Sequence, residues 1–212
     1  MTEFFDLFNP ADITAENVSL TVDLDDWFFM RTLQMRVIEV PGIIESGIVS
    51  LCQRAIIQIN QMDKDIPIED RVPIKLLISS DGGDTFAGLE LIDMIQNSKT
   101  PVWTINMGHE YSMAAIVGLA GHKRYAAKNA SFLIHDGAVS INDSGSKVHD
   151  FIKFDIQLNE RIKKFVLSKS EITARMYNSK ARNEWYFFAE EAKKLGMIDG
   201  IIGEDIEFEE II

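Results

Sequence analysis

Short apolar runs alternate with stretches of helical periodicity between residues 37 and 134, and no other feature of the sequence constrains the fold as strongly. The apolar runs are Val37–Val40, Ile74–Ile78, Val102–Met107 and Ser131–Ile134, and the helical stretches between them cover residues 44–59, 86–95 and 112–120. Strands that are apolar throughout indicate burial on both faces. The order therefore predicts an α/β fold in which crossover helices join parallel strands, the first strand ending at Pro41-Gly42.

Composition narrows the range of partners. The 212 residues suffice for one domain with a core of its own. The formal net charge of -12 repels a phosphate backbone, so we expect no nucleic-acid partner. Cys52 is the single cysteine, and no Cys/His cluster has the spacing of a zinc site, so we expect no disulfide, no metal and no cofactor. A reducing, cytoplasmic compartment fits this usage of cysteine best.

Residues 1–30 differ from the rest and are expected to form an N-terminal arm that precedes a domain over residues 31–212. The arm is rich in aromatic side chains, and such an arm typically docks onto its own or a neighbouring subunit. Its opening segment, MTEFFDLFNP, lacks the basic residues of a secretory signal. No apolar run in the chain reaches the roughly 18 residues of a membrane span, so we expect no membrane association.

The segment from Val148 to Val166 predicts one long helix, covering about residues 146–168, with apolar residues on two sides. One side carries Phe151, Phe154, Leu158, Ile162 and Phe165, and the other carries Val148, Ile152 and Ile156. A helix that is apolar on two sides needs two surfaces to pack against. We expect one of them to belong to another subunit, with the core alone as the alternative.

Three polar segments directly follow three of the predicted strands. They are Ser79–Asp84 after the second strand, Gly108–Ser112 after the third, and His135 after the fourth. Because ligands bind beyond the carboxyl ends of parallel strands, these segments are expected to share one edge of the sheet. A serine, a histidine and the N–H groups of a glycine pair are what acyl transfer needs as nucleophile, base and oxyanion donors.

Each of these residues also has a purely structural interpretation. Ser112 alone would be a helix N-cap, the Gly82-Gly83 pair a turn or a phosphate site, and His135 a structural histidine on an apolar strand. His109 and His122 are alternative bases, although the sequence around His122 favours a surface turn. The joint placement of the serine, the glycines and His135 is what favours the catalytic interpretation.

Five segments also resemble the proteolytic subunit of the Clp protease, the ClpP family, in consistent order between residues 33 and 205. The family patterns are Ser-Pro-Gly-Gly with a following Ala-Gly, Gly-x-Ala-Ser-Met-Gly-Ala, Ala-Gly…Lys-Arg-Phe, Asn-Ser-x-x-Met-Ile-His and Ala-Glu-Glu-Ala…Gly-Leu-Ile-Asp. The corresponding segments here are Ser80–Gly88, Gly108–Ala115, Ala120–Tyr125, Asn129–His135 and Ala189–Asp199. Together these motifs are specific, although none would be so alone.

The resemblance implies a ClpP/crotonase-like fold of repeated ββα units, with a mostly parallel sheet and a protruding handle helix. It implies Ser112 as the nucleophile and His135 as the general base. The oxyanion hole would come from backbone N–H groups of Gly82, Gly83 and Met113.

The resemblance also implies a self-compartmentalising serine endopeptidase that cleaves unfolded polypeptides in the cytoplasm. Two heptameric rings would stack as a tetradecamer through the helix Val148–Val166. An AAA+ ATPase unfoldase would feed substrate into the enclosed chamber.

The sequence departs from the family pattern at three places within the domain, and the arm before residue 30 has no counterpart in the family. Asp81 replaces a proline, Glu110-Tyr111 replaces small residues, and Lys180 stands where the family's third triad member, an Asp, is expected. The divergence suggests a remote branch of the family, with a phage gene as one source.

The segment Met176–Glu184 contains no Asp, which leaves three interpretations of the group that orients His135. Asn178 could accept the imidazole N–H, Lys180 could itself be the base, or the site could be impaired or completed only by assembly. We favour Asn178 or a neighbouring backbone carbonyl, because a buried neutral lysine is costly.

Three other functions remain as alternatives at this point. The chain could be a catalytically impaired ring subunit of the ClpP type, as the missing Asp suggests. It could be a phage capsid-maturation protease of the same fold. It could also be a crotonase-like acyl-CoA enzyme, which would use the paired N–H groups but would not need a serine and histidine pair.

Overall fold

The computed structural model describes residues 24–211, so most of the predicted N-terminal arm lies outside the described residues. In chain order its elements are α2 (Leu24–Met35), β1 (Val37–Ile44), α3 (Ser46–Met62), the 3₁₀ helix η1 (Ile68–Asp70), β2 (Ile74–Gly83), α4 (Thr85–Asn97), β3 (Val102–Tyr111), α5 (Met113–Gly118), β4 (Lys123–Ala126), β5 (Ser131–Ile134), α6 (Gly145–Lys169), α7 (Ala174–Lys180), β6 (Trp185–Phe188), α8 (Ala189–Lys194), β7 (Gly200–Ile201) and α9 (Phe208–Ile211).

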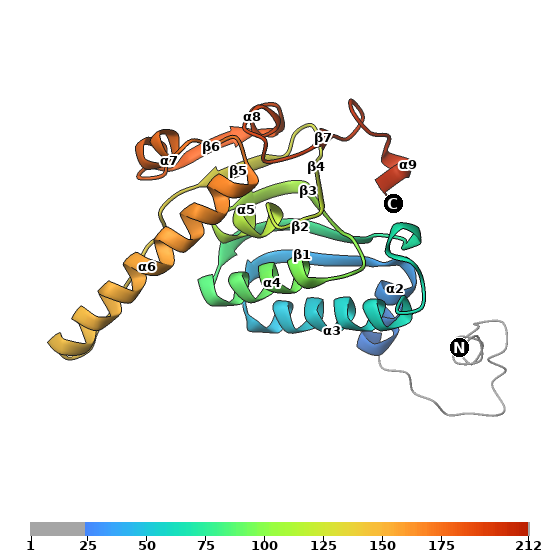
Figure 1. Ribbon diagram of the computed structural model, residues 1–212, viewed down its shortest axis with the longest axis horizontal. Helices are drawn as coiled ribbons and strands as arrows, with labels where there is room; N and C mark the ends of the chain where they lie inside the picture. Colours follow the sequence, from blue (N-terminus) through green and yellow to red (C-terminus); the bar gives the residue numbers. More distant parts are fainter. Residues whose placement is uncertain (1–23, 212) are drawn as a thin grey trace.

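The strands form one mostly parallel sheet, which confirms the predicted α/β fold class (Figure 1). Its main order is β1-β2-β3-β4-β7. β3 serves two neighbours, because its first half, Trp103–Asn106, pairs with β4 and its last three residues, His109–Tyr111, pair with β5. β6 then pairs with β5 in the antiparallel direction. The sheet therefore forks at β3, and the second branch carries its antiparallel strand.

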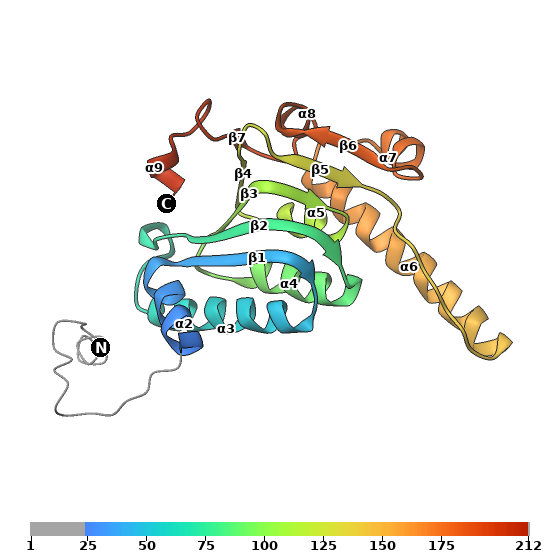
Figure 2. The same ribbon diagram turned by 180° about the vertical axis from the view of Figure 1, so that it is seen from behind.

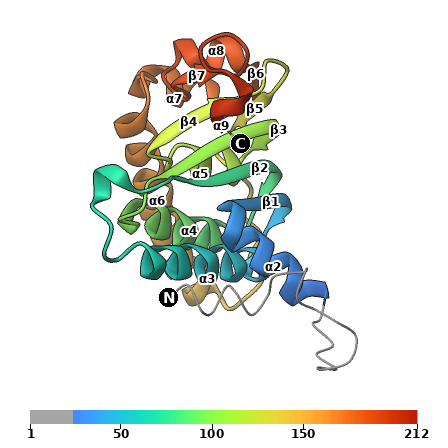
Figure 3. The same ribbon diagram turned by 90° about the vertical axis from the view of Figure 1, so that its right-hand side faces the viewer.

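The first three crossover helices lie on one face of the sheet, as right-handed β-α-β connections require. α3 and α4 lie side by side there, as the side view in Figure 3 shows. Along α3 the buried residues Val49, Cys52, Ala55, Ile56 and Ile59 recur every three or four positions, so one face of the helix packs on the strands. This burial raises the pKa of the Cys52 thiol to about 12, and the cysteine is part of the core.

Three of the predicted strands are longer than their apolar runs. β1 continues through Pro41-Gly42 to Ile44, β2 continues to Gly83, and β3 continues to Tyr111. The prediction that the first strand ends at Pro41-Gly42 was wrong, because β1 is an edge strand, where a proline without an N–H group is tolerated. Alternate polar residues of the extensions, such as Ser79 and Asp81, point away from the covered face, whereas Ser80 and Glu110 are buried.

The face of the sheet opposite α3 and α4 is seen in Figure 2, and we call it the outer face. At one end of it a small cluster forms around Ile105, Tyr125 and Ile211, the last of these on α9. At the other end β2 and β3 present Ser79, Asp81, His109 and Tyr111, none of which is buried. The outer face is therefore apolar near the amino ends of the strands and polar near their carboxyl ends.

The segment predicted as a long helix, about residues 146–168, is α6, Gly145–Lys169, which extends away from the sheet (Figure 1). Near its end Val166 is fully buried in the core. Further out, Ile152, Phe154 and Ile156 are each about half exposed or more, and the Phe154 ring stacks on Phe86 of α4. Among residues 24–211, no helix has the length and apolar character needed to cross a membrane.

Candidate active site

Ser112 lies at the turn between β3 and α5 with a backbone conformation that is rare for residues other than glycine. Its φ is 54° and its ψ is -123°. Holding a serine there costs on the order of 1–3 kcal/mol, and such strain is concentrated at functional sites. Within residues 24–211 the Ser112 side chain makes no capping hydrogen bond to α5, so the N-cap interpretation fails. The backbone N–H of Ser112 instead donates to the Leu133 carbonyl at 2.9 Å, which ties the turn to β5.

His135 directly follows β5, and its ring contacts Ser112. β3 and β5 are parallel neighbours in which Tyr111 pairs with Leu133, so the residues just beyond each strand are close in space. Ser112 Oγ lies 2.7 Å from His135 Nε2, within hydrogen-bonding distance. The structure therefore brings together the two residues that the sequence proposed as nucleophile and base.

The other ring nitrogen of His135 faces a residue that the sequence analysis passed over. Nδ1 of His135 lies 3.2 Å from Oε1 of Glu184. The preference for Asn178 as the group that orients His135 was wrong, and Glu184 was not among the three interpretations considered. The Glu184 side chain is one methylene longer than that of the expected Asp. It reaches the imidazole from a position four residues after Lys180.

The antiparallel pairing of β5 with β6 explains how Glu184 reaches this place. Ile134 pairs with Trp185. Because the strands are antiparallel, His135, which follows Ile134, is expected to lie beside Glu184, which precedes Trp185. A carboxylate immediately before the apolar strand 185–188 was the available signal. Alignment with the family pattern points to Lys180 instead, because an alignment follows sequence distance and takes no account of strand pairing.

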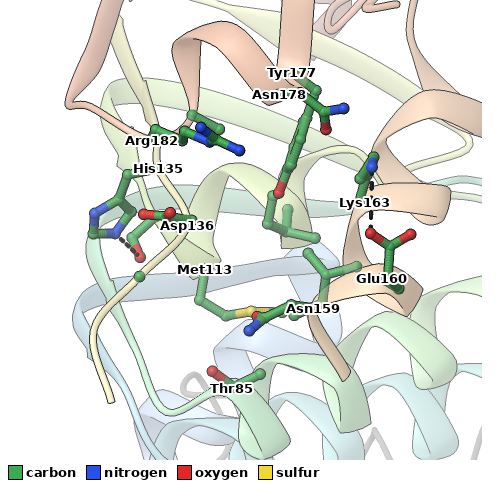
Figure 4. A pocket seen from close by; sticks show the side chains of 15 residues that line it. Thr85, Met113, His135, Asp136, Asn159, Glu160, Lys163, Tyr177, Asn178 and Arg182 are labelled. Atoms are coloured by element: carbon green, nitrogen blue, oxygen red, sulfur yellow. Dashed lines mark hydrogen bonds and ion pairs between the residues drawn. The ribbon is translucent and has the colours of Figure 1, made fainter. Parts of the chain in front are cut away.

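The two residues proposed for the orienting role have other surroundings. Lys180 places its Nζ 4.5 Å from the centre of the Trp185 ring, in a cation–π contact. Asn178 lies on α7 and lines the pocket beside the serine (Figure 4). Neither observation supports a Ser-Lys arrangement.

The Gly82-Gly83 segment packs against the nucleophile turn so closely that only glycine fits. Both residues have positive φ angles, 93° and 148°. A Cβ added to Gly82 would lie 2.6 Å from the Tyr111 carbonyl oxygen and 2.8 Å from Ser112 Cβ. A Cβ added to Gly83 would collide with the Ile44 carbonyl oxygen of β1. Gly82 thus lets β2 lie close to the nucleophile turn, and Gly83 lets β2 lie close to β1.

The three expected oxyanion donors differ in their surroundings. The Gly82 N–H donates to Ser80 Oγ at 3.1 Å, and its expected role as a donor to substrate stays a prediction. Met113 is the first residue of α5, where backbone N–H groups have no partner within the helix. Its nitrogen is 3.0 Å from the position of a Cβ on Gly82, so Met113 and the glycine pair lie together.

The rival histidines take part in other contacts. His109 lies on the outer face, with Nε2 3.2 Å from Asp81 Oδ1 and Nδ1 3.4 Å from Ser79 Oγ. His122 Nδ1 accepts the Val102 N–H at 3.1 Å, and burial lowers the pKa of His122. Neither contact involves Ser112.

A cavity of about 200 Å³ opens beside Ser112 and His135, between α5, α6 and α7 (Figure 4). Its apolar lining includes Met113, Ile116 and Ile162. Its polar lining includes the ion pair of Lys163 with Glu160, at 3.3 Å. The cavity is therefore lined by both apolar and charged side chains, and it includes Ser112 and His135 themselves.

Another carboxylic acid near Ser112 is Glu110, two residues earlier in the sequence. It lies on the inner face of β3, which the helices cover, and not on the outer face with His109 and Tyr111. It is 4% exposed, and its carboxyl group packs against Gly118 of α5. Burial raises the pKa of Glu110 well above the usual value, because the charged form of the carboxyl group is disfavoured away from water.

Comparison with known proteins identifies the family. Residues 25–205 match the family model described as Clp protease. The chain belongs to the Clp protease family. It is 31% identical over 131 residues to the ATP-dependent Clp protease proteolytic subunit 2 of Bacillus licheniformis, an alignment that covers 61% of this chain and 69% of that protein.

Membership of the Clp protease family confirms the family to which the sequence motifs pointed and supports a peptidase as the class of protein. The matched region begins at residue 25, inside the segment expected to be an arm without a counterpart in the family. α2 begins at Leu24, so the family match and the described structure start together.

Proposed function

We propose that the chain is a serine-type endopeptidase that works through an acyl-enzyme formed on Ser112. The observation that carries the proposal is the 2.7 Å approach of His135 Nε2 to a serine held at positive φ. The strained turn is consistent with a nucleophile, because the side chain is turned to the histidine and away from the helix that it would otherwise cap. The glycine pair beside it favours the same interpretation.

The reaction would proceed in two halves. Ser112 Oγ attacks the peptide carbonyl carbon while its proton passes to His135 Nε2, and the carbonyl oxygen becomes an oxyanion. The N–H groups of Met113 and Gly83 are the proposed donors to that oxygen. His135 then gives its proton to the departing amine, which leaves an ester on Ser112. A water molecule, deprotonated by His135, hydrolyses the ester and restores the serine.

Glu184 would hold His135 in the tautomer that this reaction needs. With the proton on Nδ1 facing the carboxylate, Nε2 is free to accept the serine proton, and the negative charge stabilises the imidazolium that forms. The carboxylate thereby takes the place of the missing Asp. It also removes the reason for regarding the chain as an impaired ring subunit.

The test is Ser112→Ala, assayed on a fluorescently labelled unfolded protein such as casein. We expect hydrolysis to fall to background while the melting temperature changes little, because the serine hydroxyl does not cap α5. Thr85→Ala, at another hydroxyl of the same pocket, is the control and should retain most of the activity. Full activity of Ser112→Ala would refute the mechanism.

We further propose that the chain acts as stacked heptameric rings in the cytoplasm and receives unfolded substrate from an AAA+ ATPase. The exposed apolar side chains on the outer half of α6 support a contact between copies there. Ile156→Glu changes one of these without touching the pocket, and it should split the particle seen by light scattering. A wild-type chain that is monomeric at micromolar concentration would contradict the assembly.

A further inference from the structure

We propose that Tyr186 is a positioning residue for the active site, whose phenol hydroxyl fixes the carboxylate of Glu184 against His135. The inference rests on the proposed function and extends it to a residue on the outer face. Tyr186 touches none of the atoms that react. It acts through Glu184, which in turn orients the imidazole.

Glu184 needs such support because of where it stands. Its side chain is 57% exposed, and it precedes the first residue of β6. A free glutamate side chain has three rotatable bonds, and restricting them costs up to about 2 kcal/mol. An exposed carboxylate held only by one contact to an imidazole would therefore spend much of its time pointing into solvent.

Tyr186 provides the second contact. Its hydroxyl donates to Glu184 Oε2 at 3.0 Å, while Oε1 faces His135 Nδ1. Each carboxylate oxygen thus has its own partner. Glu184 immediately precedes β6 and Tyr186 is the second residue of that strand, so the two side chains are two positions apart and can meet on one face. The hydrogen bond to the Glu184 carboxylate also raises the pKa of Tyr186, so the phenol keeps the proton that it donates.

Tyr111 in turn fixes the ring of Tyr186. The two rings meet edge to face, with centroids 5.6 Å apart. They stand in one row across three strands, because Tyr111 pairs with Leu133 and Leu133 pairs with Tyr186. Tyr111 makes its contact with Tyr186 through its ring, whereas its hydroxyl lies 2.9 Å from Ser131 Oγ and takes no part in that contact. The residue before the nucleophile is thereby linked, through two tyrosines, to the carboxylate that orients the base.

The first test removes the hydroxyl alone, with Tyr186→Phe. We expect the rate constant for fluorophosphonate labelling of Ser112, and kcat for a peptide, to fall about 3- to 10-fold while KM stays unchanged. Tyr111→Phe is the matched control, since it removes a hydroxyl from the neighbouring ring and leaves the contact with Glu184 intact. Its effect should stay below 2-fold.

A double-mutant cycle separates positioning from a general effect on the fold. In a Glu184→Ala background, Tyr186→Phe should cause no further loss, because the group that it positions is gone. If Tyr186→Phe has no effect in the wild-type background, or has the same effect in both backgrounds, the proposal is refuted.

A spectroscopic measurement decides the matter independently of activity. The Nδ1–H proton of His135 can be followed by NMR of ¹⁵N-histidine-labelled protein, with His135→Gln to assign the signal. We expect Tyr186→Phe to speed solvent exchange of this proton and to move its resonance, and Tyr111→Phe to do neither. An unchanged signal in Tyr186→Phe overturns the proposal. If the wild type fails to label but the signal responds as expected, the positioning role stands and the peptidase mechanism fails.

Discussion

The two sides of the active site are built in different ways. On one side Ser112 stands among parallel elements, β2, β3 and α5, and its position is set by backbone contacts to buried neighbours. On the other side Glu184 precedes the antiparallel strand β6, and its position is set by side-chain hydrogen bonds at the surface. The nucleophile is held by close packing, whereas the base is oriented by an exposed network.

This difference determines how each side responds to substitution. Close packing leaves no room, so even one added methyl group on the nucleophile side forces the backbone to move. In a surface network each substitution removes one contact, so the loss of activity on the orienting side should depend on which contact is removed. Substitutions on the two sides should therefore differ in the size of their effects and in whether they also lower stability.

The largest effect is expected on the nucleophile side, from Gly82→Ala. The new methyl group would meet the Tyr111 carbonyl oxygen and Ser112 Cβ, and the residue would keep an unfavourable φ of 93°. We expect peptide hydrolysis to be abolished and the melting temperature to fall.

Gly42→Ala is the control for the backbone strain alone. Gly42 also has positive φ, 67°, but among residues 24–211 no atom lies within 4 Å of the position of its Cβ. It should lose only about 1 kcal/mol of stability and retain activity. Equal loss of activity in both variants would show that crowding at Ser112 is not the cause.

On the orienting side, Glu184→Ala should lower kcat by on the order of 10²- to 10⁴-fold without lowering the melting temperature. The carboxylate is exposed, so its removal leaves no buried group unpaired. Lys180→Ala tests the alternative and should stay within about 3-fold of wild type. The reverse result, with Lys180 essential and Glu184 dispensable, would assign the base to a Ser-Lys pair.

The smallest effect on activity is expected for Glu110, on the inner face of β3, where the prediction concerns stability. Because burial raises the pKa of Glu110, the folded chain binds a proton that the unfolded chain releases near the usual value of 4.5. Wild-type stability is therefore lost as the pH rises from that value to the folded pKa, at about 1.4 kcal/mol per pH unit. Glu110→Gln removes this loss.

The expected observation is a stability gain in Glu110→Gln that grows from pH 4 to pH 8, measured by urea unfolding. Glu39→Gln, at an exposed position of β1, controls for the loss of one acidic side chain. A gain that is the same at both pH values would contradict a buried neutral carboxyl group.

The same contrast explains how far the sequence could predict the structure. Apolar runs and helical periodicity are local signals, so they predicted the parallel sheet and the edge that carries Ser112 and His135. The role of Glu184 depends on an antiparallel pairing between segments about 50 residues apart, so a carboxylate before the apolar run 185–188 becomes informative only once that pairing is known. The strand extensions through Gly83 and Tyr111 were missed because they interrupt the apolar runs with polar residues, of which Ser80 and Glu110 are nevertheless buried.

The central claim is that Ser112, and no other serine, is the nucleophile. The most direct measurement is treatment of the wild-type protein with a fluorophosphonate, followed by mass spectrometry of its peptides. We predict a single adduct on Ser112 and none in Ser112→Ala. Ser79, which lies beside His109 and Asp81, is the one other serine with histidine and carboxylate partners among residues 24–211. An adduct on Ser79, or no adduct at all, would contradict the account.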